Sequence, residues 1–150
     1  MTNTQAYERT MGRLIEEVWN GKNLNILAEV FTEDAAMHHS GPQDRGGHDM
    51  HGIAAFREGY MRPTQTAFPD IQHQVKDLLF DGDKVVMRFH GEGTHKGEFL
   101  GIKPTNKVMR YEGIAIFRMQ GTRIAEVWVH SNAAKQLAAL CSASAGMGSS

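Results

Sequence analysis

Apolar residues recur at steps of three and four in several parts of the chain, the spacing that places one helix face against a core. This pattern predicts a helix over Thr4–Trp19 and a shorter one over Leu24–Phe31. A third helix is predicted over Gly52–Arg62, where Pro63 should end or kink it because proline removes a helical hydrogen bond. A fourth is predicted over Ala133–Leu140. Three of the four predicted helices therefore lie in the first half of the chain, and the fourth follows the last predicted strand.

Segments rich in β-branched and aromatic residues, bounded by turn-forming residues, predict the strands. They cover Asp34–His39, Ile71–Phe80, Lys84–Thr94, Lys107–Met119 and Ile124–His130. The segment Ser40–Asp49 is rich in Gly, Pro and Asp and is predicted to be a loop. Helices followed by a run of antiparallel strands are typical of an α+β layer, not of alternating βαβ units. We expect one α+β domain over residues 1–141 and a disordered tail over residues 142–150.

Alternate residues of a strand point to opposite faces of its sheet, so each strand can be divided into two sets. In the strand over 107–119, the set Met109, Tyr111, Gly113, Ala115 and Phe117 has no charge and contains two small residues. We expect this set to face the helices and to leave room for a ligand. The same rule predicts an inward set of Val85, Met87, Phe89, Val127, Val129 and Ser131, with Arg88, His90, Glu126, Trp128 and His130 outward. On the first strand, either Met37 with His39 or Ala36 with His38 faces inward.

The bulk composition narrows the class of protein. A chain of 150 residues is long enough for one domain with a substantial core. Sixteen Lys and Arg residues against seventeen Asp and Glu residues leave a net charge of −1, without the clustered basic face that nucleic acid requires. No apolar run is long enough to span a membrane, and charged residues interrupt the first twenty positions. The lone Cys141 has no internal disulfide partner. We expect a cytoplasmic protein that binds neither nucleic acid nor membrane.

Four sequence runs together resemble one known family. They are FPDI at 68–71, DGDKVVMRF at 81–89, GTHKGEFLGIKPTNK at 93–107 and RIAEVW at 123–128. In their order and spacing, the chain from about Gly52 to Cys141 resembles the SnoaL-like polyketide cyclases, or ester cyclases, of the nuclear transport factor 2-like superfamily. The resemblance implies a cone-shaped, curved, mostly antiparallel sheet wrapped by N-terminal helices around one cavity, the nuclear transport factor 2-like or cystatin-like fold. It also implies a homodimer formed through the sheet and no cofactor.

The resemblance also locates the positions at which family members carry their acid/base groups. Aldol-type cyclases use an aspartate on the last strand and a histidine on the preceding strand, and these positions are Val129 and Ala115 here. A further acidic position of the family is Asn132 here. By analogy with ketosteroid isomerases, the base at the end of the first strand is His39, which favours His39 as inward-facing. The usual aspartate is thus missing.

A catalytic pair can still be proposed from the residues that remain. His39 could accept a proton near neutral pH, and Tyr111 could donate a hydrogen bond to a developing enolate oxygen. The alternatives are a histidine that only hydrogen-bonds the following loop and a tyrosine that fills space. The predicted substrate-binding residues are Phe56, Tyr60, Met87, Phe89, Met109, Ala115, Phe117, Val127, Val129 and Ser131. We expect a cofactor-free cyclase or isomerase of a hydrophobic, carbonyl-bearing, polyketide-like metabolite, or alternatively a non-catalytic binding module for a small apolar metabolite.

A metal site is the remaining possibility that the sequence raises. His48 and His51 are three residues apart, close to His38, His39 and the acidic Asp44 and Asp49, and such nitrogen and oxygen ligands can hold a metal. Spacing alone is weak evidence, and the family that the chain resembles is metal-free. We therefore predict no metal.

Overall fold

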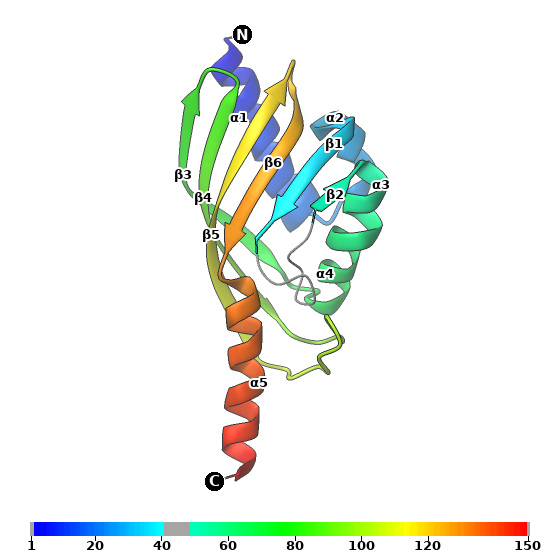
Figure 1. Cartoon of the computed structure of the whole chain (residues 1–150), viewed down its shortest axis with the longest axis vertical. Helices are drawn as coiled ribbons and strands as arrows, with labels where there is room; N and C mark the ends of the chain where they lie inside the picture. Colours follow the sequence, from blue (N-terminus) through cyan, green and yellow to red (C-terminus); the bar gives the residue numbers. More distant parts are fainter. Residues whose placement is uncertain (1, 41–48, 150) are drawn as a thin grey trace.

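The fold is built on one curved sheet in this computed structural model, which describes residues 2–40 and 49–149, with side chains up to residue 141. The strands are β1 (Phe31–His39), β2 (Asp49–His51), β3 (Gln72–Asp81), β4 (Lys84–Thr94), β5 (Val108–Gln120) and β6 (Arg123–Ser131). Their spatial order is β2-β1-β6-β5-β4-β3, and every neighbouring pair is antiparallel except β1 with β6 (Figure 1). The predicted mostly antiparallel α+β sheet is confirmed.

Helical segments flank this sheet. They are α1 (Asn3–Arg13), η1 (Leu14–Asn20), η2 (Leu24–Ile26), α2 (Leu27–Val30), α3 (Ile53–Phe56), η4 (Arg57–Met61), α4 (Arg62–Ala67) and α5 (Ala133–Ser149). The segments η1 and η4 are π-helical. Figure 1 shows α1 lying along the sheet, α3 and α4 beside β2, and α5 extending away from the end of β6. No helix in the described part of the chain is long and apolar enough to cross a membrane.

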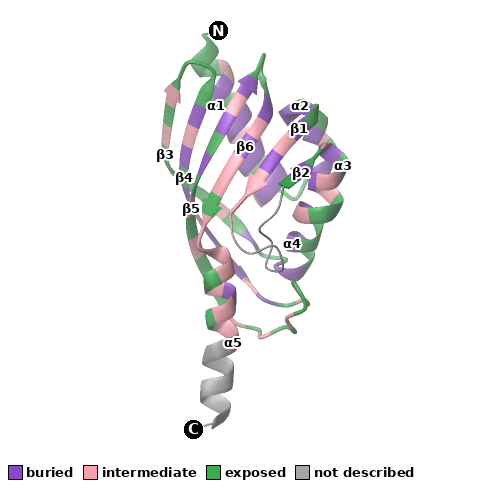
Figure 2. Ribbon diagram, viewed as in Figure 1, coloured by how far each residue is buried: buried purple, intermediate pink, exposed green. Residues whose placement is uncertain are grey.

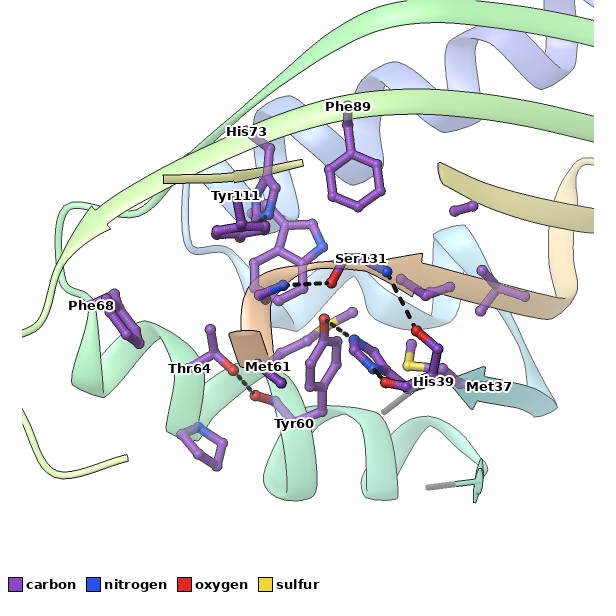
Figure 3. Close-up of a pocket in the computed structure, with 18 of the residues that line it drawn as sticks. Met37, His39, Tyr60, Met61, Thr64, Phe68, His73, Phe89, Tyr111 and Ser131 are labelled. Carbon is purple, nitrogen blue, oxygen red and sulfur yellow. Dashed lines mark hydrogen bonds between the residues drawn. The ribbon is translucent and has the colours of Figure 1, made fainter. Parts of the chain in front are cut away.

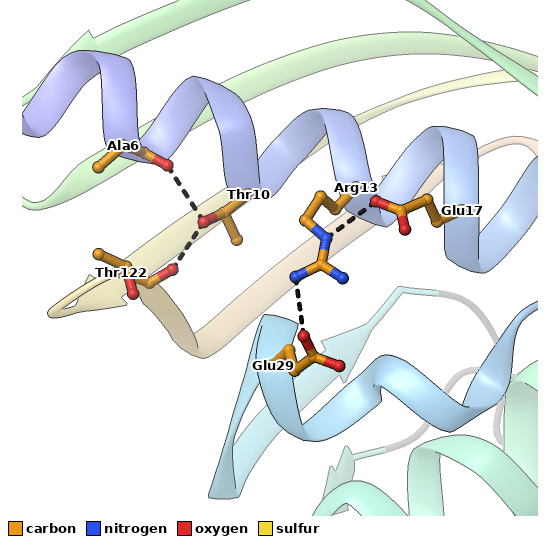
Figure 4. Close-up of polar contacts among 6 residues, drawn as sticks. All are labelled: Ala6, Thr10, Arg13, Glu17, Glu29 and Thr122. Carbon is orange, nitrogen blue, oxygen red and sulfur yellow. Dashed lines mark hydrogen bonds and ion pairs between the residues drawn. The ribbon is translucent and has the colours of Figure 1, made fainter. Parts of the chain in front are cut away.

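Polar contacts fix the first helix in place. Thr2 begins α1 with a capping box, in which its side chain accepts from the Gln5 N–H and the Gln5 side chain accepts from the Thr2 N–H. The buried Thr10 hydroxyl donates to the Thr122 carbonyl in the β5–β6 turn at 2.6 Å (Figure 4). On the exposed side, Arg13 pairs with Glu17 at 2.8 Å. The helix is thereby attached to the sheet at a site remote in sequence.

Burial along the central strands follows the predicted alternation (Figure 2). On β5, Met109, Ala115 and Phe117 are buried, whereas Ile114 and Ile116 on the opposite face are 48% and 38% exposed. The strands β4 and β6 keep the same phase, because their inward residues pair directly with those of β5. The inward and outward assignments made from the sequence are confirmed for these three strands.

The sequence predicts that Pro63 ends or kinks the third helix, and the helix does not end there. The helical backbone passes from α3 through η4 into α4 and ends at Ala67. Pro63 lies at the start of α4, directly after the π-helical segment η4. The wider π-helical turn ahead of the proline separates it from α3.

The larger remaining differences from the prediction concern β1, β2 and α5. The strand β1 begins at Phe31, three residues earlier than expected, and α2 ends at Val30. The three-residue β2 was not predicted, because a strand this short has no measurable alternation. The last helix continues to Ser149, so the backbone of residues 142–149 is helical where we expected a disordered tail. Alanine favours the helix and no proline follows Leu140, so nothing local stops α5 there.

Candidate functional site

A cavity of about 230 Å³ lies between the inner face of the sheet and the helical segments. All the predicted substrate-binding residues except Phe56 line it, together with both predicted catalytic residues, His39 and Tyr111. The two π-helical segments also line it, through Leu14, Ile15 and Trp19 of η1 and through Gly59, Tyr60 and Met61 of η4. The lining is therefore mostly apolar, with a few polar groups, as is usual for a small-molecule site.

Phe56 is a correction to the predicted substrate-binding set. Its side chain is fully buried and packs edge-to-face on Phe31, with ring centroids 5.2 Å apart. The sequence placed Phe56 and Tyr60 on one helical face because they are four residues apart. Phe56 is the last residue of α3, and Tyr60 lies in the π-helical segment η4. Phe56 packs in the core, and Tyr60 lines the cavity.

His39 and Tyr60 form the first of two histidine–tyrosine pairs in the cavity. The His39 Nδ1–H donates to the Ser40 carbonyl at 2.9 Å, which leaves Nε2 as the unprotonated nitrogen of the neutral ring. The Tyr60 hydroxyl lies 3.5 Å from this Nε2 (Figure 3). Burial raises the pKa of Tyr60 to about 12, so its hydroxyl keeps its proton at neutral pH. The structure thus places His39 inward, as the family resemblance implied.

Tyr111 and His73 form the second pair. The Tyr111 hydroxyl lies 2.5 Å from His73 Nε2, and the two rings meet edge-to-face (Figure 3). Burial lowers the pKa of His73 to about 4, so the imidazole is neutral at pH 7. Burial, together with the nearby Tyr60, raises the pKa of Tyr111 above its ordinary value. Sequence reasoning did not identify His73.

A glycine makes the second pair possible. His73 on β3 is opposite Gly91 on β4, and Gly91 is opposite Tyr111 on β5. A Cβ atom added at Gly91 would lie only 2.5 Å from Tyr111 Cζ. The Tyr111 side chain therefore crosses β4 through the space that a side chain at position 91 would fill. We call these three residues the His73 row.

Trp19 brings the two pairs to the same region of the cavity. Its ring centroid lies 5.5 Å from that of Tyr60 and 4.8 Å from that of His73, both in edge-on geometry. The end of the same helical segment also holds β3, because the Asn20 side chain accepts from the His73 N–H at 2.7 Å and donates to the His73 carbonyl at 3.0 Å. The segment η1 therefore sets the position of His73.

The family's usual acid/base positions are apolar or structural here. Ala115 and Val129 are paired across β5 and β6 and both line the cavity, but neither carries a titratable group. Asn132 has a structural contact, because its Oδ1 accepts from the Glu112 N–H at 2.9 Å. The titratable side chains that line the cavity are therefore the two histidine–tyrosine pairs and Glu98.

The described histidines considered for a metal site do not form one. His38 faces outward, where its ring nitrogens contact Asp49 at 3.1 Å and Glu126 at 2.7 Å. His51 is exposed on β2, while His48 and Asp44 lie outside the described residues. No group of three His, Cys, Asp or Glu side chains in the described ranges is placed to hold a metal ion. The hydrogen bonds to Glu126 and Asp49 raise the pKa of His38.

Comparison with known proteins agrees with this architecture. The model of the SnoaL-like polyketide cyclase family matches residues 9–140. The search of curated proteins found no match. Among solved structures, IdmH, a proposed polyketide cyclase from Streptomyces antibioticus, is 29% identical, with a TM-score of 0.72 over 87% of this chain and 97% of that one.

Two further structures show the same fold at lower identity. A proposed SnoaL-like polyketide cyclase from Jannaschia sp. CCS1 is 19% identical, with a TM-score of 0.79 over 91% of this chain and 92% of that one. AclR, a proposed hydroxylase from Streptomyces galilaeus, is 22% identical, with a TM-score of 0.75 over 93% of this chain and 86% of that one. Proteins with different proposed activities thus share this architecture, so an activity must be argued from the residues of the cavity.

Proposed function

Because the chain belongs to the SnoaL-like polyketide cyclase family, we propose that it is a cofactor-free cyclase or isomerase of a hydrophobic, carbonyl-bearing metabolite. In this proposal His39 is the base and Tyr111 the hydrogen-bond donor. The observation that carries it is the orientation of His39, whose Nδ1–H is held by the Ser40 carbonyl so that Nε2 can accept a proton. A base oriented by a second group in an apolar cavity is a common arrangement for proton abstraction.

The proposed reaction moves one proton and one electron pair. His39 Nε2 takes a proton from the carbon next to the ligand's carbonyl group. The C–H electron pair becomes the enolate, whose oxygen accepts a hydrogen bond from the Tyr111 hydroxyl. In cyclisation, the enolate carbon then attacks a second carbonyl carbon in the same molecule, the C=O electron pair moves to the attacked group's oxygen, and this oxygen takes the proton back from His39. In isomerisation, a different carbon takes the proton back from His39. Because nothing is oxidised or reduced, the reaction needs no cofactor.

Hydrogen–deuterium exchange of a model ketone tests this proposal. The probe is 2-tetralone, a bicyclic ketone with acidic α-hydrogens, followed by proton NMR in D₂O. The wild-type protein should accelerate exchange above buffer. His39→Asn should reduce the acceleration by about 10²- to 10⁴-fold, the usual contribution of a positioned base. Asparagine can still donate to the Ser40 carbonyl, so the local structure is retained.

The control is His51→Asn, which changes an exposed histidine outside the cavity. It should leave the exchange rate at the wild-type value. Equal exchange by the His39 variant and the wild type would show that His39 is not the base.

A binding module without catalysis is the second candidate function. It is favoured by the apolar Ala115 and Val129 at the positions where family members carry acid/base groups. It predicts that 2-tetralone binds but that its α-hydrogens exchange at the rate measured in buffer. The exchange experiment therefore separates the two candidates.

We also propose that the outer face of the sheet binds a second copy of this chain. Leu79, Val86, Ile116 and Trp128 are paired in one row across β3, β4, β5 and β6 on this face. Leu79 is 62% exposed, and salt bridges such as Arg118–Glu126 at 3.2 Å provide both signs of charge nearby. An apolar row bordered by both charges can pack against its own copy.

Sedimentation velocity tests the dimer. The wild type should sediment as a dimer and Ile116→Asp as a monomer, because the new carboxylate would be buried without a partner. Ala54→Asp adds the same charge to an exposed position on α3 and should leave the dimer unchanged. A monomeric wild type would refute the proposal.

A further inference from the structure

The His73 row holds a half-buried polar pair that no family position accounts for. His73 and Tyr111 lie on β3 and β5, on either side of β4, and the absent side chain of Gly91 lets the Tyr111 hydroxyl reach His73 Nε2 at 2.5 Å. Resting on the proposed function, we propose that His73 is a positioning residue that fixes the Tyr111 hydroxyl as a donor to the carbonyl oxygen of the ligand. The protein would then bind a ligand with a ketone oxygen at this end of the cavity more tightly than the matching hydrocarbon.

The direction of the His73–Tyr111 hydrogen bond decides what Tyr111 can do. His73 Nδ1 is buried and has no hydrogen-bond partner among the described residues. If Nδ1 carried the proton, a buried N–H would be left unpaired, which proteins tolerate less well than an unpaired acceptor. The proton therefore belongs on Nε2, which donates to the Tyr111 oxygen. The Tyr111 O–H is then available to donate to a ligand in the cavity.

The surroundings of His73 keep this arrangement in place. Its backbone is held at both N–H and carbonyl by the Asn20 side chain. Its ring contacts Trp19 at 4.8 Å and Phe89 at 5.8 Å between centroids. These apolar rings disfavour a charged imidazole, and the lowered pKa of His73 has the same cause. A neutral histidine that donates through Nε2 can orient Tyr111 without taking its proton.

The tautomer of His73 can be measured on the protein without a ligand. Nitrogen-15 NMR at pH 7 distinguishes the two neutral forms of an imidazole. We expect a protonated Nε2 and a pyridine-like Nδ1 for His73. A protonated Nδ1 would overturn the proposal, because the Tyr111 hydroxyl would then be donating to His73 and could not donate to a ligand.

Ligand selectivity is the second measurement. The probes are 2-tetralone and tetralin, which share one carbon skeleton and differ in the carbonyl oxygen. Calorimetric titration should show that the wild type prefers the ketone. Tyr111→Phe should reduce the affinity for 2-tetralone by about three- to tenfold, the value of one hydrogen bond, and leave the affinity for tetralin unchanged.

Two variants of His73 separate positioning from packing. His73→Leu should lose the ketone preference, because leucine fills space without donating to Tyr111. His73→Gln should restore most of it, because the glutamine amide can donate from nearly the same place as Nε2. A Leu variant that keeps the preference, or a wild type that binds the ketone no better than tetralin, would overturn the proposal.

These results are independent of turnover by His39. His39→Asn should keep the ketone preference and the His73 tautomer even though it stops exchange. If the wild-type protein does not accelerate exchange but still prefers 2-tetralone to tetralin, the proposed function is wrong and the role of His73 stands. If the wild-type protein accelerates exchange but does not prefer the ketone, the roles of His73 and Tyr111 are wrong and the role of His39 as the base stands.

Discussion

Replacing Gly91 by alanine would test the His73 row without touching either of its functional side chains. The new Cβ would lie 2.5 Å from Tyr111 Cζ and 2.6 Å from the Tyr111 hydroxyl oxygen. Because carbon atoms in contact lie roughly 3.5 Å apart or more, the ring must retreat by about 1 Å, away from His73. Overpacking of this kind costs about 1 to 3 kcal/mol, and one lost hydrogen bond costs about 1 kcal/mol more.

We therefore expect Gly91→Ala to lower the free energy of unfolding by about 2 to 4 kcal/mol, measured by urea denaturation. Gly12→Ala is the matched control, because a Cβ at this helical position meets no atom within 4 Å. It should stabilise the protein by about 0.5 to 1 kcal/mol through helix propensity. The two substitutions are thus expected to change the free energy of unfolding in opposite directions.

A double-mutant cycle identifies the atoms responsible. In a Tyr111→Ala background the ring is absent, so the added Cβ at position 91 should cost almost nothing. The reasoning is refuted if Gly91→Ala unfolds at the wild-type urea concentration, or if its cost is the same with and without the Tyr111 ring.

Three other predictions concern the cavity and its histidines. Ala115→Phe should abolish 2-tetralone binding while changing the melting temperature little, because Ala115 lines the cavity; a loss of 1 to 3 kcal/mol would instead indicate a packed core. Because the folded pKa of His73, about 4, lies below its unfolded value, urea stability should fall as pH decreases from about 6.5 toward 4, and His73→Gln should flatten this slope. Because the folded pKa of His38 is raised, its contribution is complete below pH about 6.5 and is lost as pH rises through the folded pKa; His38→Gln should remove this loss.

The central strands could be predicted closely because their pairing is regular. The strand β4 has the predicted bounds, and its register with β5 is continuous from Lys84 and Arg118 to Thr94 and Val108. An uninterrupted register keeps one set of side chains inward along the whole strand. The alternation of residues in the sequence therefore predicts directly which side chains of these strands line the cavity.

His73 could not be predicted because β3 is irregular. Counting back in steps of two from the inward Leu78 places Gln74 inward and His73 outward. The register shifts between Val75 and Asp77, and this bulge turns His73 to the inner face. No local sequence feature marks the bulge. Pairing of His73 with a glycine on the next strand is visible only once the register is known.

The helical lining was predicted only in part, because Tyr60 lines the cavity as expected, Phe56 does not, and Trp19 was not identified. Apolar residues at steps of three and four predicted ordinary α-helices over both lining segments. The structure has π-helical turns there, and Trp19 and Tyr60 line the cavity while Phe56 packs in the core. Spacing alone cannot distinguish the two helical types over five to seven residues.

The parallel pairing of β1 with β6 has a consequence for when the cavity forms. His38 and Glu126 are neighbours across this pair although they lie 88 positions apart in sequence. Contacts between such distant segments form slowly, because a long loop must close before they are gained. During synthesis on the ribosome, β1 would lack its partner β6 until almost the entire domain had emerged. His39 and Val129, opposite each other across this pair, would meet only in the last stage of synthesis, so no ligand could bind a partial chain.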